Sequence, residues 1–180
     1  MDISAIAAFL VLGSCAGFAA GLLGIGGGIL MVPFIIMLLS GMGISKELVI
    51  HMAIATSLAT IMFTSISSVR AHHRHGAVIW KIVKQLAPGI LVGSWVGAWV
   101  GKQMNSTSMA IFFGSFVALS ATQMLLDKKP SAARELPNTA GMFSAGGVIG
   151  VLSGLVGIGG GIVSVPFMTW SNVRIHNAVA

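Results

Sequence analysis

The sequence is poor in charge, in acidic residues and in cysteine. Only 8% of its 180 residues are charged, 56% are hydrophobic, and the mean hydropathy is +0.96. Such a chain lacks the polar side chains needed to cover a globule in water, so it is predicted to be an integral membrane protein. The single cysteine, Cys15, excludes an intramolecular disulfide and is interpreted as a small packed residue.

Acidic residues are missing from every predicted membrane span. The acidic residues stand in the N-terminus or in connectors: Asp2, Glu47, Asp127 and Glu135. Without a carboxylate at membrane depth, a buried carboxylate site for a cation is disfavoured and a site for an anion is favoured. Asp2 also stands where a cleaved signal peptide would carry basic residues, so we expect the apolar segment after it to be retained as a span.

The basic residues fall in short connectors between apolar segments. The formal net charge is +6, but no exposed aromatic residues are interleaved with the basic ones, so nucleic-acid binding is not expected. The two richest clusters, in loops 70–81 and 127–138, are separated by two spans and are predicted to be cytoplasmic. Three histidines in the first cluster have no carboxylate or cysteine nearby, so no metal site is predicted.

A glycine-rich segment occurs twice in the chain. Residues 21–34 read GLLGIGGGILMVPF, and 133 residues later residues 154–167 read GLVGIGGGIVSVPF. Each glycine costs a helix about 1 kcal/mol relative to alanine. Each copy therefore predicts a membrane helix that breaks, exposes backbone N–H groups and restarts before a proline. A phosphate-binding loop is disfavoured, because Ile29 and Leu30 follow Gly28 where a Walker motif has Lys and Ser or Thr.

The apolar segments predict an all-α, polytopic transmembrane fold built from an internal repeat with glycine-broken helices. The expected spans and shorter limbs are residues 3–23, 29–39, 48–69, 82–100, 109–126, 139–156 and 162–170. The first repeat is assigned to residues 1–130 and the second to residues 131–180. The second copy stops in mid-helix, so we expect a truncated repeat. Inverted and parallel arrangements of the repeats both stay open, and precedent among transporters favours inversion.

A glycine ladder in the expected span 82–100 and just beyond it predicts close helix packing. It consists of Gly89, Gly93, Gly97 and Gly101. Such a ladder is typical of a groove for a neighbouring helix, which belongs either to the scaffold of the chain or to a homodimer.

The predicted substrate site lies at the two glycine breaks. Two half-helix N-termini supply free N–H donors and the positive end of the helix dipole, about half an elementary charge each, which favours an anion. The predicted substrate-binding residues are Gly24, Gly26, Gly27, Gly28, Thr56, Ser57, Gly157, Gly159, Gly160 and Gly161. His51 and, in the second copy, His176 and Asn177 are candidates for a proton or substrate path, and an interfacial position is the alternative for His51.

The doubled GxGGGxxxVPF pattern, with each copy followed by a helix that opens His-x-Ala at His51 and His176, resembles the sulfite exporter TauE/SafE family of membrane permeases. The resemblance implies a multi-pass carrier of the bacterial inner membrane, without a cofactor, for sulfite, sulfonates or related organosulfur and organic anions. An anion channel and a structural subunit with packing-only glycines are the alternatives. No nucleophile, acid and base are grouped near the breaks, so an enzyme is not expected.

Overall fold

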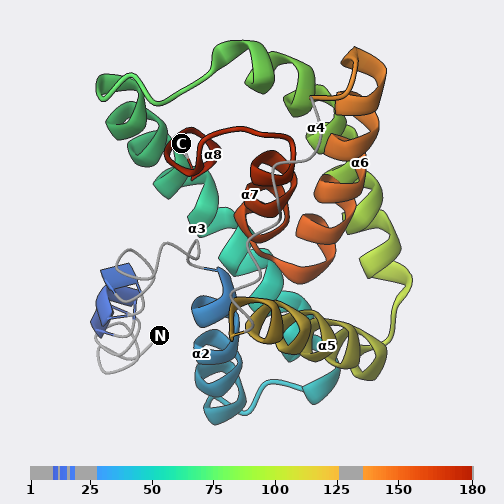
Figure 1. Ribbon diagram of the computed structural model, residues 1–180. Coiled ribbons are helices and arrows are strands. Elements are labelled where there is room, and N and C mark those ends of the chain that lie inside the picture. The colour runs from blue at the N-terminus through green and yellow to red at the C-terminus, as the bar shows by residue number, and fades with distance from the viewer. Residues whose placement is uncertain (1–9, 12, 16, 19–27, 126–135, 180) are drawn as a thin grey trace.

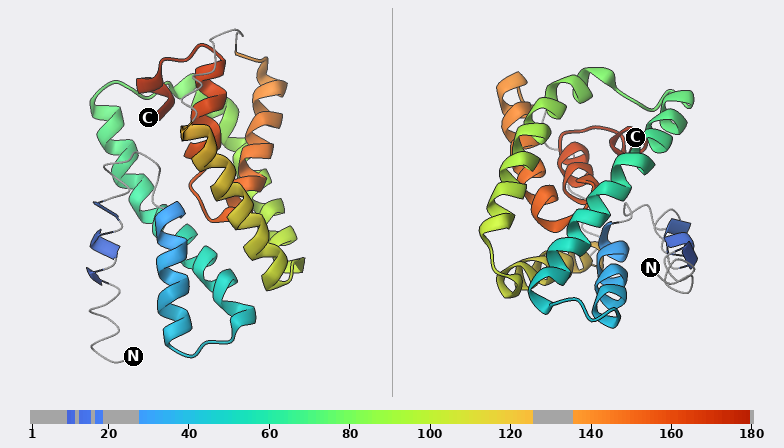
Figure 2. Two further views of the ribbon diagram at one scale, coloured as in Figure 1. Left: turned by 60° about the horizontal axis from the view of Figure 1, so that its bottom comes forward. Right: turned by 180° about the vertical axis from the view of Figure 1, so that it is seen from behind.

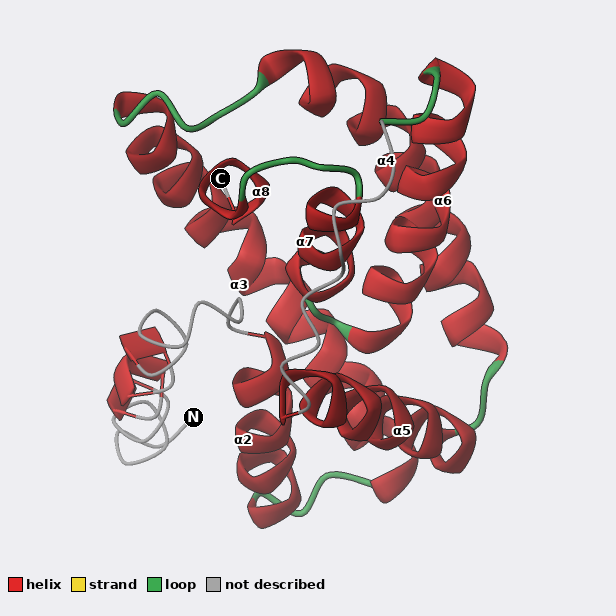
Figure 3. Ribbon diagram, in the orientation of Figure 1, coloured by secondary structure: helices red, strands yellow, loops and turns green. Residues whose placement is uncertain are grey.

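The computed structural model describes residues 10–11, 13–15, 17–18, 28–125 and 136–179. Within these residues the chain forms helices and no strand, as Figures 1 and 3 show, which confirms the all-α class. The helices are α2 (Gly28–Gly41), α3 (Lys46–Arg74), α4 (Trp80–Gln103), α5 (Ser106–Leu125), α6 (Thr139–Val156), α7 (Gly161–Trp170) and α8 (Ile175–Val179). Most of the expected first span, residues 3–23, lies outside the described residues.

Helix α3 is longer than the sequence predicted. It runs to Arg74 instead of residue 69, so about half of the loop expected at 70–81 is helical, and the connector is residues 75–79. No glycine or proline interrupts this stretch before Gly76, and the basic residues of its last turn interact favourably with the negative end of the helix dipole. At 1.5 Å per residue α3 is about 44 Å long, more than the roughly 30 Å hydrocarbon core of a bilayer.

Two helices of the described residues, Lys46–Arg74 and Thr139–Val156, are long and apolar enough to cross a membrane. Large apolar side chains also lie on outward faces. Phe63 is 75% exposed and Trp95 is 78% exposed. A water-soluble monomer rarely exposes so much apolar surface, whereas a bilayer covers it. The exposed faces of α3 and α4 are therefore the surfaces that suit lipid.

Helices α4 and α6 lie side by side in every view (Figures 1 and 2) and make the most extensive helix contact of the described chain. A Cβ atom added to Gly93 would lie 2.1 Å from the Gly147 carbonyl oxygen, and one added to Gly150 would lie 2.3 Å from the Ile90 carbonyl oxygen. The backbones approach this closely because no side chain separates them. The predicted ladder of α4 thus packs against α6 of the same chain, and the face suggested for a homodimer is already occupied.

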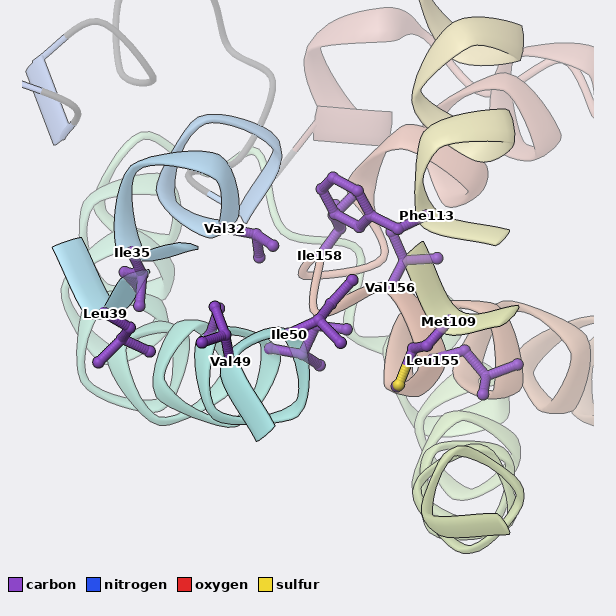
Figure 4. Close-up of a cluster of buried hydrophobic side chains, with 12 residues drawn as sticks. Val32, Ile35, Leu39, Val49, Ile50, Met109, Phe113, Leu155, Val156 and Ile158 are labelled. Atoms are coloured by element: carbon purple, nitrogen blue, oxygen red, sulfur yellow. The ribbon is translucent and has the colours of Figure 1, made fainter. Parts of the chain in front are cut away.

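Two buried apolar clusters hold the remaining helices. The first, drawn in Figure 4, joins α2, α3 and α5 to the end of α6 and the residues after it. Its members are Val32, Ile35, Leu39, Val49, Ile50, Ala53, Ile54, Met109, Phe113, Leu155, Val156 and Ile158. The second joins α4 to α6, and Val163, Phe167 and Met168 of α7 pack against it. Helix α7 is therefore held in the middle of the molecule (Figure 1).

We predict that Gly146→Ala separates α4 from α6, because the new methyl group would lie 2.4 Å from the Leu86 carbonyl oxygen. Overpacking of this kind costs about 1–3 kcal/mol. Gly147→Ala is the matched control, since its nearest neighbour, the Gly89 carbonyl oxygen, is 4.0 Å away. That change should be neutral or stabilise α6 by up to about 1 kcal/mol. The free energy of unfolding in detergent measures both, and equal values would contradict the proposed packing.

Candidate functional site

The second glycine segment interrupts the helix between α6 and α7. Gly157 ends α6 with φ of 72°, and its N–H donates to the Ser153 carbonyl at 2.9 Å. Gly160 precedes α7 with φ of 74°, and its carbonyl accepts from the N–H of Ser164 at 2.9 Å. Both residues adopt left-handed backbone angles that favour glycine. The break at residues 157–160 is thus present, and α7 begins with amides that have no acceptor within the helix.

Ser57 connects this break to the middle of α3. Its side chain is 1% exposed, and its Oγ–H donates to the Gly157 carbonyl at 2.9 Å. A Cβ atom on Gly157 would lie 3.0 Å from Ile54 Cγ2, and one on Gly159 would lie 3.4 Å from Ile61 Cγ2. The structure therefore brings the predicted site residues Ser57, Gly157 and Gly159 together on one face of α3.

The first break lies mostly outside the described residues. Gly24, Gly26 and Gly27 are not described, whereas Gly28 is the first residue of α2. Figures 1 and 2 show α2 and α7 leaving the middle of the molecule in opposite directions. Val32 of α2 and Ile158 of the second break belong to the same buried cluster and face each other in Figure 4. The start of α2 and the second break therefore meet in one region.

Thr56 lies next to Ser57 but has different surroundings. It is exposed, and its Oγ1–H donates to the Met52 carbonyl of its own helix at 2.7 Å. It also lines a small cavity of about 170 Å³ together with Met31 and Phe34 of α2. Thr56 is thus near the start of α2, with its hydroxyl hydrogen used within α3.

His51 connects α3 to the end of α4. Its ring is half-buried, Nε2 lies 3.3 Å from the Gly101 carbonyl oxygen, and the buried Nδ1 atom has no hydrogen-bond partner among the described residues. The tautomer with the hydrogen on Nε2 donates to this carbonyl of the last turn of α4 and leaves Nδ1 as an acceptor. This bond positions α3 against α4.

The second-copy candidates lie elsewhere. His176 is exposed on α8, and Asn177 Nδ2 donates to the Ala77 carbonyl at 2.8 Å. His51 bonds near residue 101 and Asn177 bonds at residue 77, just before α4 begins. These partners are separated by 24 residues, about 36 Å along a helix. The structure thus places His51 and Asn177 near opposite ends of α4.

One residue at the break was missed by the sequence analysis. The Ser153 hydroxyl donates to the Ile158 carbonyl across the interruption. The first copy has Ala20 at the corresponding position, so the repeat carries no signal for it. A single serine near the end of an apolar helix is otherwise most often bonded to its own preceding turn.

The interrupted helix, the apolar outer faces and the two candidate spans together define a helical membrane protein with an irregular, partly buried backbone segment between two helices. Residues 9–180 match the family described as "Sulfite exporter TauE/SafE". The chain belongs to this family, which is one of membrane transporters and not of enzymes.

Relatives with known sequences agree with this assignment. The chain is 36% identical over 171 residues to a "Probable membrane transporter protein" of Haemophilus influenzae, covering 94% of this chain and 65% of the relative. It is 33% identical over 178 residues to YunE of Bacillus subtilis, also named a probable membrane transporter protein, covering 88% and 65%. The chain thus spans about 65% of the length of these relatives. No solved structure matches it.

We predict that Ser57→Ala destabilises the protein, because the buried Gly157 carbonyl then loses its side-chain donor. An unpaired buried polar group costs about 1–3 kcal/mol. The neighbouring Thr56→Ala removes an exposed hydroxyl that bonds its own helix and should change stability by less than about 0.5 kcal/mol. Thermal or chemical unfolding in detergent compares the two variants. Equal losses would show that Ser57 does not support the break.

Proposed function

We propose that the protein transports small oxyanions across the membrane and binds them between the N-terminal ends of α2 and α7. The observation that carries this proposal is the break at residues 157–160, which starts α7 in the same region as the start of α2. The first amides of each helix and the positive ends of both helix dipoles favour a negative solute there. The proposed ligands are the glycines of both breaks, with Thr56 and Ser57 beside them.

The hydrogen bond of Ser57 refines its proposed role. Its hydroxyl hydrogen is donated to the Gly157 carbonyl, so Ser57 holds the break in position and leaves anion contacts to the backbone amides. Sulfite and sulfonates are the proposed substrates, since the family carries the description of a sulfite exporter. Each of these anions offers three oxygen acceptors, which suits a site built from several N–H donors.

We also propose that residues 1–130 and 131–180 form two related repeats in the bacterial inner membrane, with the second incomplete. The opposite directions of α2 and α7 in Figures 1 and 2 support an inverted relation between the repeats. Connector 75–79 and the segment 127–138 are proposed to face the cytoplasm, since the richest basic clusters flank or occupy them. His51 remains a proposed proton carrier.

We predict that Gly161→Ala lowers sulfite transport without unfolding the protein. A Cβ atom at Gly161 meets nothing within 4 Å, and alanine favours a helix by about 1 kcal/mol, so the fold should be kept. The methyl group would stand beside the first amides of α7 and weaken a charge-assisted hydrogen bond worth about 1.5–3 kcal/mol. Transport efficiency, kcat/KM, should fall about tenfold to hundredfold, which sulfite flux into vesicles containing the full-length protein measures.

Gly114→Ala is the matched control, because its Cβ atom on α5 also meets nothing within 4 Å. Its flux should equal that of the unaltered protein. Equal flux in both variants would remove α7 from the proposed site. Flux that rises linearly with sulfite concentration and never saturates would favour a channel over a carrier, and the absence of any sulfite flux would overturn the proposed substrate.

A further inference from the structure

A second polar region lies at the far end of α7 from the break. A cavity of about 720 Å³, here called the outer cavity, opens between the starts of α4 and α6 and the turn from α7 to α8. Its polar and charged lining residues are Lys81, Gln85, Asn138, Thr139, Asn172, Arg174 and Asn177. It is larger and more polar in its lining than the small cavity beside Thr56.

The described charged residues of the outer cavity have one sign. Among the residues that the structure describes, Lys81 and Arg174 line it, no acidic residue does, and neither cation has an ion-pair partner. Two of the amide side chains are fixed by hydrogen bonds. Asn138 Oδ1 accepts from the Gly141 N–H at 2.9 Å and caps α6, and Asn177 Nδ2 donates to the Ala77 carbonyl at 2.8 Å. The lining therefore presents two cations without a described ion-pair partner, on a framework held by hydrogen bonds to neighbouring residues.

The starts of two long helices add to this potential. The cavity is lined by Ile79 and Lys81 at the start of α4 and by Asn138 and Thr139 at the start of α6. The dipoles of both long helices have their positive ends there, in the same sense as the two side-chain charges, whereas the shorter α7 ends at Trp170 with the negative end of its dipole nearby. A concave surface with one sign of charge raises the local concentration of the opposite ion.

The outer cavity and the proposed substrate site lie at opposite ends of α7. This helix begins at the break and ends at Trp170, just before the lining residues Asn172 and Arg174. Its ten residues measure about 15 Å. Val163 and Phe167 of α7 and Val173 after it pack against the cluster that contains Ile82, which also lines the cavity. An anion in the outer cavity is thus about one short helix away from the break.

We propose that the outer cavity is an oxyanion-binding vestibule that gathers the substrate for the site at the glycine breaks, with Lys81 and Arg174 as its specificity-determining residues. This inference rests on the proposed function. The cavity would recognise an oxyanion whose charge is spread over several oxygens. A soluble sulfite ion and the phosphate group of an anionic lipid both have this property. The proposal assigns the cavity to the soluble ion.

The test uses the full-length protein in vesicles of neutral phosphatidylcholine, with sulfite as the probe. In a water-filled site, a cation about 6 Å from the anion strengthens its binding about threefold. Replacing both cations, in the double variant Lys81→Gln with Arg174→Gln, should therefore raise KM about tenfold at low salt and leave kcat unchanged. The rise should shrink as salt is added. Lys84→Gln, an exposed cation of α4 that does not line the cavity, is the matched control and should change KM less than twofold.

Equilibrium binding of labelled sulfite to the same purified variants separates this proposal from the proposed function. The vestibule is supported if the unaltered protein binds sulfite, the double variant binds it more weakly, and the conservative single variant Lys81→Arg binds it as the unaltered protein does. This holds even where no flux is observed. Binding or KM that changes equally in the double variant and in Lys84→Gln overturns it. Sulfite binding that falls on adding phosphatidylglycerol in the unaltered protein but not in the double variant would show that the cavity takes lipid phosphate, which also overturns the proposal.

Discussion

The structure depends on how the interrupted backbone between α6 and α7 satisfies its polar groups in an apolar surrounding. Each unpaired buried group costs about 1–3 kcal/mol. Side-chain hydroxyls pair with the carbonyls of the break: Ser57 donates to Gly157, and Ser153 donates to Ile158. The amides of Gly161 and Ile162, at the start of α7, have no such partner among the described residues, and an anion is the solute that helix-start amides favour.

A rigid support is needed to hold such an interruption in one conformation. The contact between α4 and α6 supplies it, because backbones in direct contact have few alternative arrangements. The contact runs along α6 as far as Gly154, whose added Cβ atom would lie 2.8 Å from the Ser94 carbonyl oxygen. The break begins three residues later at Gly157. The end of α6 is thus fixed by α4 before Ser57 fixes the break itself.

Local patterns predicted the helices, whereas their partners depend on contacts between distant residues. The bounds of α6 and the position of the second break follow from apolar length and glycine clustering. The glycine ladder of α4 predicted a packing groove, but a glycine has no side chain that identifies its partner helix. The hydroxyls of Thr56 and Ser57 are equivalent in sequence, yet one bonds its own helix and the other bonds a residue 100 positions away. Lys81 was interpreted as a topology signal because charge in a connector does not show which cavity it lines.

The opposite directions of α2 and α7 determine what the proposed central site can bind. Helices that leave one region in opposite directions place both positive dipole ends there, so their positive electrostatic potentials add. The buried side chains of Val32, Phe113 and Ile158 form an apolar wall of this region, which strengthens the attraction but requires the anion to lose part of its hydration. The cost of losing hydration falls as the radius over which the charge is spread increases. A region with several backbone donors and apolar walls therefore favours anions with charge spread over several oxygens above small, strongly hydrated ones.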